Sequence, residues 1–352
     1  MRKLALSSLV FFTSLGPTRA HAQGTPYEEL TVLRHPERVL GGHTFLAPTF
    51  FPSAFVATHF AFRQGLVQVD LGDYPLSSGA TTDLSLLGVS ERIEVALRFA
   101  DRFQVFAGGT GEIFLGTNLR SAIVGGGSFN YRVHGGGAVR LVRSAMTGTE
   151  LSLRAFGQYG PGSFFDLWRL VEGVVENDPD TAQAVVDGNL GRLTLRDTVR
   201  GEVALQLLLA HALSSTFGLQ AELGAGYDWS RLTFFDLDEN RDIDTHSHAF
   251  VPDLGLVFGA NLGPRVPLGF LAEYSLRFGR RTLPGSEEVD EEFSQLLGLS
   301  AHLVHPQFDF GLSIARLFNS EGISRLDPEG ETLTSESPAV NYLQLTLQFT
   351  WW

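Results

Sequence analysis

The feature that most constrains this chain is an alternation of side chains with a period of two residues. From Phe217 to Trp229 every odd position is apolar, while the even positions hold glycine, glutamine, glutamate or aspartate. Because successive side chains of a strand point to opposite faces, this segment predicts a strand with one apolar and one polar face. The same period recurs in residues 268–278, 203–209 and 93–99.

The length of these segments separates a membrane barrel from a soluble sheet protein. Strands of soluble sandwiches run for about 5 or 6 residues, whereas tilted membrane strands need roughly nine or more, as several segments here have. A transmembrane helix needs roughly 18 apolar residues, and the longest apolar stretch, Val203–Leu213, contains Gln206 and His211. The sequence therefore predicts an all-β fold, a transmembrane antiparallel up-and-down β-barrel.

Twelve segments carry the alternation, and an even number is what single-chain bacterial barrels have. They span residues 53–63, 81–90, 92–107, 131–143, 149–160, 199–212, 216–230, 248–262, 267–281, 293–304, 306–318 and 341–352. Tight connections at 90–91, 144–148, 213–215, 263–266 and 305 alternate with long ones at 64–80, 108–130, 161–198, 231–247, 282–292 and 319–340. We expect the tight turns at the periplasmic rim and the long loops outside.

The N-terminus has the order of a secretory signal peptide. Basic Arg2 and Lys3 precede an apolar stretch and the small-residue triplet Ala20-His21-Ala22, so residues 1–22 are expected to be removed after Sec-type export. Residues 23–52 would be a periplasmic N-terminal segment and residues 53–352 the barrel. That segment either enters the barrel, like the hatch of hydrophobic-compound transporters, or forms a disordered or rim-packed tail.

The C-terminus carries a family resemblance. Residues 342–352 alternate to an aromatic end, Trp351-Trp352, which resembles the C-terminal signal of bacterial outer-membrane β-barrel proteins, although that family usually ends in Phe. The resemblance implies a place in the outer membrane, contact with its lipid and lipopolysaccharide, and recognition by the barrel-assembly machinery. The mature chain also resembles uncharacterised barrel transporters of similar size, some of them linked to uptake of aromatic compounds.

Charge and composition exclude two classes of function. The formal net charge is −13, and residues 1–22 hold three basic residues and no acidic one, which brings the mature chain to −16. Such a surface repels phosphates, so we expect no nucleic-acid partner. The chain has no cysteine, so neither disulfides nor thiol chemistry is available.

Ten charged residues on the polar faces of the predicted strands are candidates to line a pore. They are Glu94, Arg98, Arg140, Glu150, Arg154, Glu202, Glu222, Glu273, Arg277 and Asp309. They either line a water-filled lumen or pair and brace a filled one, because twelve strands lie between the filled eight-stranded and the open sixteen-stranded barrels. The first alternative predicts a channel or transporter for small solutes, hydrophobic compounds included. The second predicts a structural or surface-interaction barrel.

The third outer loop carries a helix pattern. Ser163 is placed to cap a helix, Asp166 follows three residues later, and apolar residues then recur at helical spacing. The apolar face needs a partner, so the helix either folds into the barrel mouth or caps the outside. An inward helix would form a constriction that favours cations. Its residues would be Trp168, Glu172, Glu176 and Asp187.

The fourth outer loop has the spacing of a calcium loop. Oxygen ligands recur at every second position, in Asp236, Asp238, Asn240, Asp242 and Asp244, as a hard cation with six to eight oxygen ligands requires. However, Arg241 replaces the turn glycine and Ser247 replaces the bidentate glutamate. Calcium binding is weighed against a solvated acidic loop, and no other cofactor is expected.

A lipid-modifying enzyme is the remaining hypothesis. His246 and His248 flank Ser247 near the predicted outer rim, but no nucleophile motif accompanies them, and we expect no enzymatic activity.

Deletion of Trp351 and Trp352 is expected to leave the protein degraded in the periplasm, because the last strand closes the barrel and removes its edge. The measurement is the amount of protein in isolated outer membranes. Unchanged outer-membrane levels would contradict the assignment of residues 341–352 as the closing strand.

Millimolar calcium is expected to raise the thermal melting temperature if the acidic loop binds the ion, and Asp238→Ala should abolish the rise. Equal melting with calcium and with chelator would leave the solvated loop as the explanation.

Overall fold

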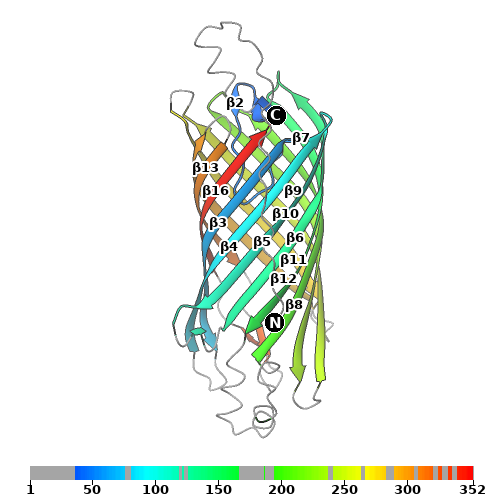
Figure 1. Cartoon of the computed structure of the whole chain (residues 1–352), viewed down its shortest axis with the longest axis vertical. Helices are drawn as coiled ribbons and strands as arrows, with labels where there is room; N and C mark the ends of the chain where they lie inside the picture. The colour runs from blue at the N-terminus through cyan, green and yellow to red at the C-terminus, as the bar shows by residue number, and fades with distance from the viewer. Residues whose placement is uncertain are drawn as a thin grey trace, which may run out of the picture.

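The computed structural model is one closed antiparallel barrel of twelve strands (Figure 1). No helix in the described part of the chain is long and apolar enough to cross a membrane. The structure describes residues 36–75, 81–118, 121–122, 126–165, 186, 194–236, 241–262, 266–282, 289–304, 308–319, 324–326, 332–334 and 339–351.

Each barrel strand pairs with its neighbours in the chain, and the last strand pairs with the first, from Ala339 opposite Asp70 to Trp351 opposite Thr58. This closure leaves no free edge. The predicted all-β fold, strand number and up-and-down topology are confirmed. The strands are β3 (Thr58–Pro75), β4 (Thr81–Phe99), β5 (Phe103–Gly116), β6 (Gly127–Ser144), β7 (Thr149–Phe165), β8 (Leu195–Ala212), β9 (Phe217–Asp236), β10 (Arg241–Asn261), β11 (Leu268–Thr282), β12 (Val289–Val304), β13 (Phe308–Asn319) and β16 (Ala339–Trp351). A short hairpin, β14 (Ser324–Leu326) and β15 (Thr332–Thr334), lies between β13 and β16.

The predicted tight turn at Ser90 and Glu91 is wrong. Both residues lie within β4, and the turn is at residues 100–102. Glu91 lies on the exposed face of the wall, where it accepts a hydrogen bond of 3.0 Å from Gln64 of β3. Ser90 is buried and polar, and Glu91 is exposed and polar. Together they interrupt the apolar–polar alternation, although the strand continues.

The strands also extend further than predicted at the outer end. Strand β3 begins at Thr58, not at residue 53, and continues to Pro75, β5 reaches Gly116, and the gap between β9 and β10 is only residues 237–240. The predicted loops at 64–80, 108–130 and 231–247 are therefore largely strand. The apolar outward face is needed only within the bilayer, whereas backbone pairing continues beyond it.

The predicted helix in the third outer loop does not begin at Ser163. Residues 163–165 end β7, and the Ser163 hydroxyl donates to Asp197 of β8 at 2.9 Å. The proposed constriction residues Trp168, Glu172, Glu176 and Asp187 lie outside the described residues.

Residues 36–57, which we call the plug, lie inside the barrel at the end with the tight turns (Figure 1). They form a 3-10 turn η1 (Pro36–Arg38), β1 (Val39–Leu40), β2 (His43–Thr44) and then irregular chain to Ala57. Residues 36–52 are thus no rim tail, and residues 1–35 lie outside the described part.

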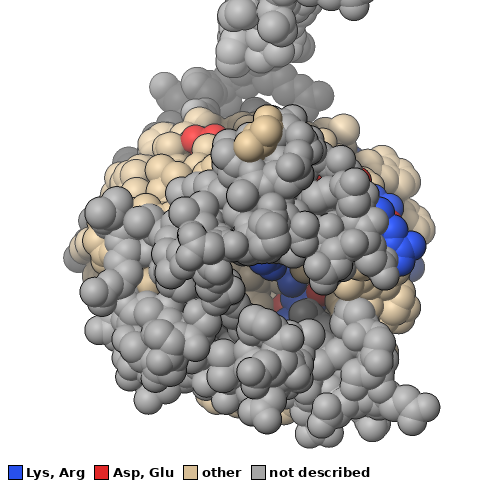
Figure 2. Space-filling view, turned by 90° about the horizontal axis from the view of Figure 1, so that it is seen from below, with Lys and Arg blue, Asp and Glu red and all other residues tan. Residues whose placement is uncertain are grey.

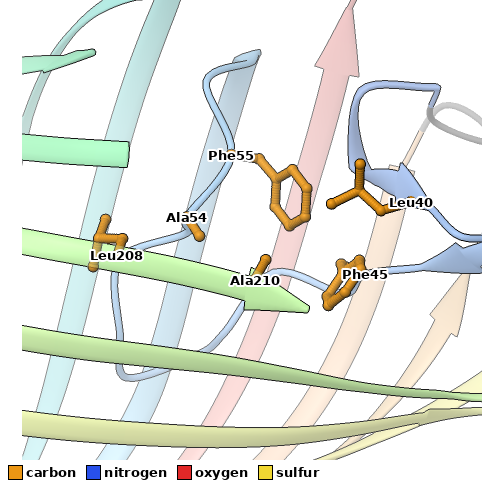
Figure 3. Close-up of a cluster of buried hydrophobic side chains, with 6 residues drawn as sticks. All are labelled: Leu40, Phe45, Ala54, Phe55, Leu208 and Ala210. Atoms are coloured by element: carbon orange, nitrogen blue, oxygen red, sulfur yellow. The ribbon is translucent and has the colours of Figure 1, made fainter. Parts of the chain in front are cut away.

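Two apolar clusters hold the plug against the wall. One joins plug residues Leu40, Phe45, Ala54 and Phe55 to inward side chains of β8, Leu208 and Ala210 (Figure 3). The other joins Leu46 to Val257 and Leu271 on β10 and β11. Burial of these side chains supplies the non-directional part of the attachment.

Candidate functional site: the plugged lumen

Arg38 anchors the start of the plug. Its guanidinium lies 2.9 Å from Asp309 Oδ2 of β13 and donates to Thr350 Oγ1 of β16 at 2.7 Å. Arg38 is 2% exposed, so this charge-assisted contact is shielded from water. The neighbouring Glu37 pairs with Arg98 of β4. Burial raises the pKa of the Glu37 carboxyl, against the opposing effect of Arg98.

The irregular part of the plug has its backbone groups bound by side chains of the wall. The Glu273 carboxylate of β11 accepts the N–H groups of Thr49 and Phe50 at 2.9 and 3.0 Å. Plug carbonyl oxygens accept hydrogen bonds from wall residues that include Arg63, Gln104, Ser152 and Gln220. Because an enclosed backbone needs partners for its polar groups, these inward side chains take the place of a neighbouring strand.

Glu150 of β7 is the most enclosed of the charges that meet the plug, with 0% exposure. Its carboxylate lies 2.9 Å from Arg140 Nε and 2.7 Å from Arg143 Nη1, and it accepts the Val56 N–H at 3.5 Å. Arg140 also donates to the Val56 carbonyl at 3.1 Å. Glu150 thus fixes both the plug and the two arginines beside it.

Beyond the plug, toward the outer end, the lumen holds a cavity of about 360 Å³. Plug residues 49–52 form its floor, and inward side chains of the wall line it. Arg277 lies 3.0 Å from Glu202 Oε1, and the Arg154 guanidinium lies 4.1 Å from the centre of the Phe106 ring. Seen from the outer end, arginine and acidic side chains are visible within a central opening (Figure 2). The cavity is therefore charged, with both signs present. We call it the inner cavity.

Glu94 of β4 lies close to several charged or titratable side chains beside the inner cavity. Its carboxylate lies 3.2 Å from His59 Nε2, 3.4 Å from His134 Nε2, 3.1 Å from Arg92 and 3.8 Å from Arg154. One half-buried carboxylate thus lies close to two arginines and two imidazole rings.

The structure places the ten candidate pore residues inside the barrel, in two groups. Those that contact the plug are Arg98, Arg140, Glu150, Glu273 and Asp309. Those in or beside the inner cavity are Glu94, Arg154, Glu202, Glu222 and Arg277. The alternation in the sequence shows that a charged residue faces inward. It does not show whether that residue contacts the plug or lines the cavity.

Sequence reasoning missed several charges of the lumen. Arg63 donates to the plug, Arg92 pairs with Glu94, and Arg132 of β6 lies 3.2 Å from Glu112 of β5. Arg92 follows the wrongly predicted turn, and Glu112 lies in a predicted loop. The alternation that continues through β4 and β5 is the signal that places them on the inward face.

The predicted calcium loop is described only in part. Asp236 ends β9 opposite Arg241, and Asp242 and Asp244 belong to β10. Asp238 and Asn240 lie outside the described residues. Thr233 donates to Asp244 at 2.6 Å. The His, Asp and Glu residues that the structure describes form no group of three that could hold a metal ion, and calcium binding at this hairpin stays a prediction.

The histidines of β10 do not meet the serine between them. The Ser247 hydroxyl lies 2.6 Å from the Ser230 hydroxyl, and His248 Nδ1 lies 2.9 Å from the Tyr227 hydroxyl. Alternating exposure along β10 puts His246 and His248 on the face opposite Ser247. These three residues form no catalytic group.

Comparison with known proteins finds likeness in structure only. No family model and no curated protein matches the sequence. The COG4313 outer membrane channel from Pseudomonas putida F1 matches with a TM-score of 0.53 and 11% identity, over 87% of this chain and 100% of that chain. The translocator domain of the autotransporter NalP from Neisseria meningitidis matches with a TM-score of 0.44 and 10% identity, over 83% and 88% of the two chains. The Pseudomonas putida toluene transporter TodX gives a TM-score of 0.36 at 10% identity, over 86% and 91%.

The chain has the fold of a bacterial outer-membrane β-barrel. The closed twelve-strand wall and its apolar outward face agree with this likeness, which extends to the fold and leaves the solute open.

Glu150→Ala is expected to lower the free energy of unfolding by about 3 kcal/mol, because it strands two arginines in a buried site. Urea unfolding in lipid vesicles, followed by tryptophan fluorescence, measures the change. Glu91→Ala is the control, since it removes a carboxylate from the exposed face of the same barrel wall. Equal unfolding midpoints for the two variants would show that Glu150 does not hold the plug.

Proposed function

We propose that this outer-membrane barrel is a channel for small solutes, with its periplasmic end closed by the plug. The observation that carries the proposal is the charged inner cavity, which ends on plug residues 49–52. A barrel that serves only as a scaffold is filled by its own wall side chains and needs no such space. The likeness in fold to a solved outer membrane channel supports the same function.

The lining of the inner cavity favours polar solutes over hydrocarbons. Arg154, Glu202, Glu222 and Arg277 all face it. A hydrocarbon placed against these groups would displace their water without replacing its hydrogen bonds. Hydrophobic compounds are therefore the less favoured class of solute for this channel.

Passage in this proposal requires the plug to move while the wall stays intact. The plug is bound largely through side chains, such as Arg38 to Asp309 and Glu273 to two backbone N–H groups. As the plug moves and water enters, such contacts to charged groups exchange for contacts with water at a net cost of about 1.5–3 kcal/mol each. The backbone hydrogen bonds between strands cannot be exchanged in this way, because the bilayer core holds no water.

Sec-type export and the barrel-assembly machinery would deliver and insert the chain in the same proposal. Lipid and lipopolysaccharide would then cover the apolar outward face. The alternative is a structural or surface-interaction barrel, which the filled periplasmic end favours.

Deletion of residues 36–57 is expected to raise the single-channel conductance in planar bilayers severalfold, because it removes the floor of the inner cavity. Heat-modifiable migration on electrophoresis checks that the variant is folded. A folded deletion variant without conductance steps would favour the structural barrel.

Glu273→Gln is expected to increase the frequency of opening in the full-length channel without changing the step size. The substitution keeps the shape of the side chain but weakens its two bonds to the plug backbone. Glu91→Gln is the matched control, because it makes the same chemical change on the exposed face. An opening frequency that is the same in both variants would argue against plug displacement as the gating step.

A further inference from the structure

A second cavity, of about 420 Å³, lies toward the outer end of the lumen. We call it the outer cavity. It is centred on β7, where Gly160 and Gly162 occupy inward positions. Gly162 is paired with Asn130 of β6 and Thr198 of β8, and Gly160 is paired with Arg200 of β8. Polar side chains from two strands therefore flank a stretch of β7 whose two inward positions carry no side chain.

The missing side chain at Gly162 creates room for its neighbours. A Cβ atom there would lie 2.0 Å from Asn130 Oδ1 and 2.8 Å from Thr198 Oγ1. Both polar atoms thus occupy space over the glycine backbone, and both line the outer cavity. The result is a concave surface with an amide and a hydroxyl at its base.

The lining of the outer cavity is basic, although the chain as a whole is acidic. Three arginines at inward strand positions, Arg132, Arg196 and Arg200, and one acid, Glu112, give its described lining a formal charge of +2, whereas the whole chain has −13. Glu112 is held by Arg132 at 3.2 Å. On the other side of the glycines, Arg196 and Arg200 share the inward face of β8 with Thr198.

We propose that the outer cavity binds a small oxyanion, a carboxylate or phosphate group of a solute. Guanidinium groups bind such oxygens in a bidentate fork, and the Thr198 hydroxyl and Asn130 amide can donate to the remaining lone pairs. The two cavities share Glu112 and Arg132, so a bound anion would lie directly above the inner cavity. The place of this site on a transport route rests on the proposed function, whereas binding itself does not.

The test is a calorimetric titration of the full-length protein in non-ionic detergent with benzoate, inorganic phosphate and benzamide. Benzamide has the shape of benzoate without its charge. We expect saturable binding of benzoate or phosphate, and at least tenfold weaker binding of benzamide. The double variant Arg196→Gln with Arg200→Gln should weaken anion binding by at least tenfold. Arg316→Gln, which removes an exposed arginine near the outer end of β13, should leave anion binding unchanged.

The proposal is overturned if neither anion binds, if benzamide binds as well as benzoate, or if the double variant keeps the affinity of the unaltered protein. The comparison of the two anions with uncharged benzamide uses the unaltered protein, so it decides the question even if the double variant does not fold. Because binding is measured without current, a non-conducting protein that binds anions would contradict the proposed channel and leave the anion site standing.

Discussion

Backbone N–H and C=O groups that face hydrocarbon have no water to bind, and this barrel satisfies them by pairing every strand on both sides. The pairing of β16 with β3 completes the ring. Once the backbone is satisfied, outward side chains such as Leu97 and Leu345 can be apolar and exposed to lipid. The inward side chains are then free to carry the charges that a chain in lipid could not hold elsewhere.

The plug obeys the same rule by different means. Its irregular backbone cannot pair with a strand, so Glu273, Ser152 and Gln104 supply the partners from the wall. Where the plug presents apolar side chains, the wall residues that contact them are apolar too. Leu208 and Ala210 lie on the inner face of β8, and Leu207 lies on its outer, lipid-facing side. The most apolar stretch of the chain is therefore the strand that faces lipid on one side and the plug on the other.

The sequence predicted the barrel because the alternation follows directly from burial on one face, and it predicted the inward charges for the same reason. It could not assign Glu150 or Asp309 to the plug, since contacts between residues 36–57 and distant strands leave no local pattern. The false turn at Ser90 has a local cause, an exposed Glu91 bound to Gln64. The outer parts of the strands escaped prediction because an apolar face is no longer required there. The two cavities depend on register, which places Gly160 beside Arg200.

In the proposed channel, selection and closure lie at different heights along the axis. The basic outer cavity would attract an anion, because field lines are focused between low-dielectric walls. Below it the charge is mixed, with Arg154 and Arg277 set against Glu202 and Glu222, so an anion released from the outer cavity meets no uniform barrier or trap. Closure belongs to the plug, through Arg38, Glu150 and Glu273. None of the three lines the outer cavity, so the residues that choose the solute can change without loosening those that close the lumen.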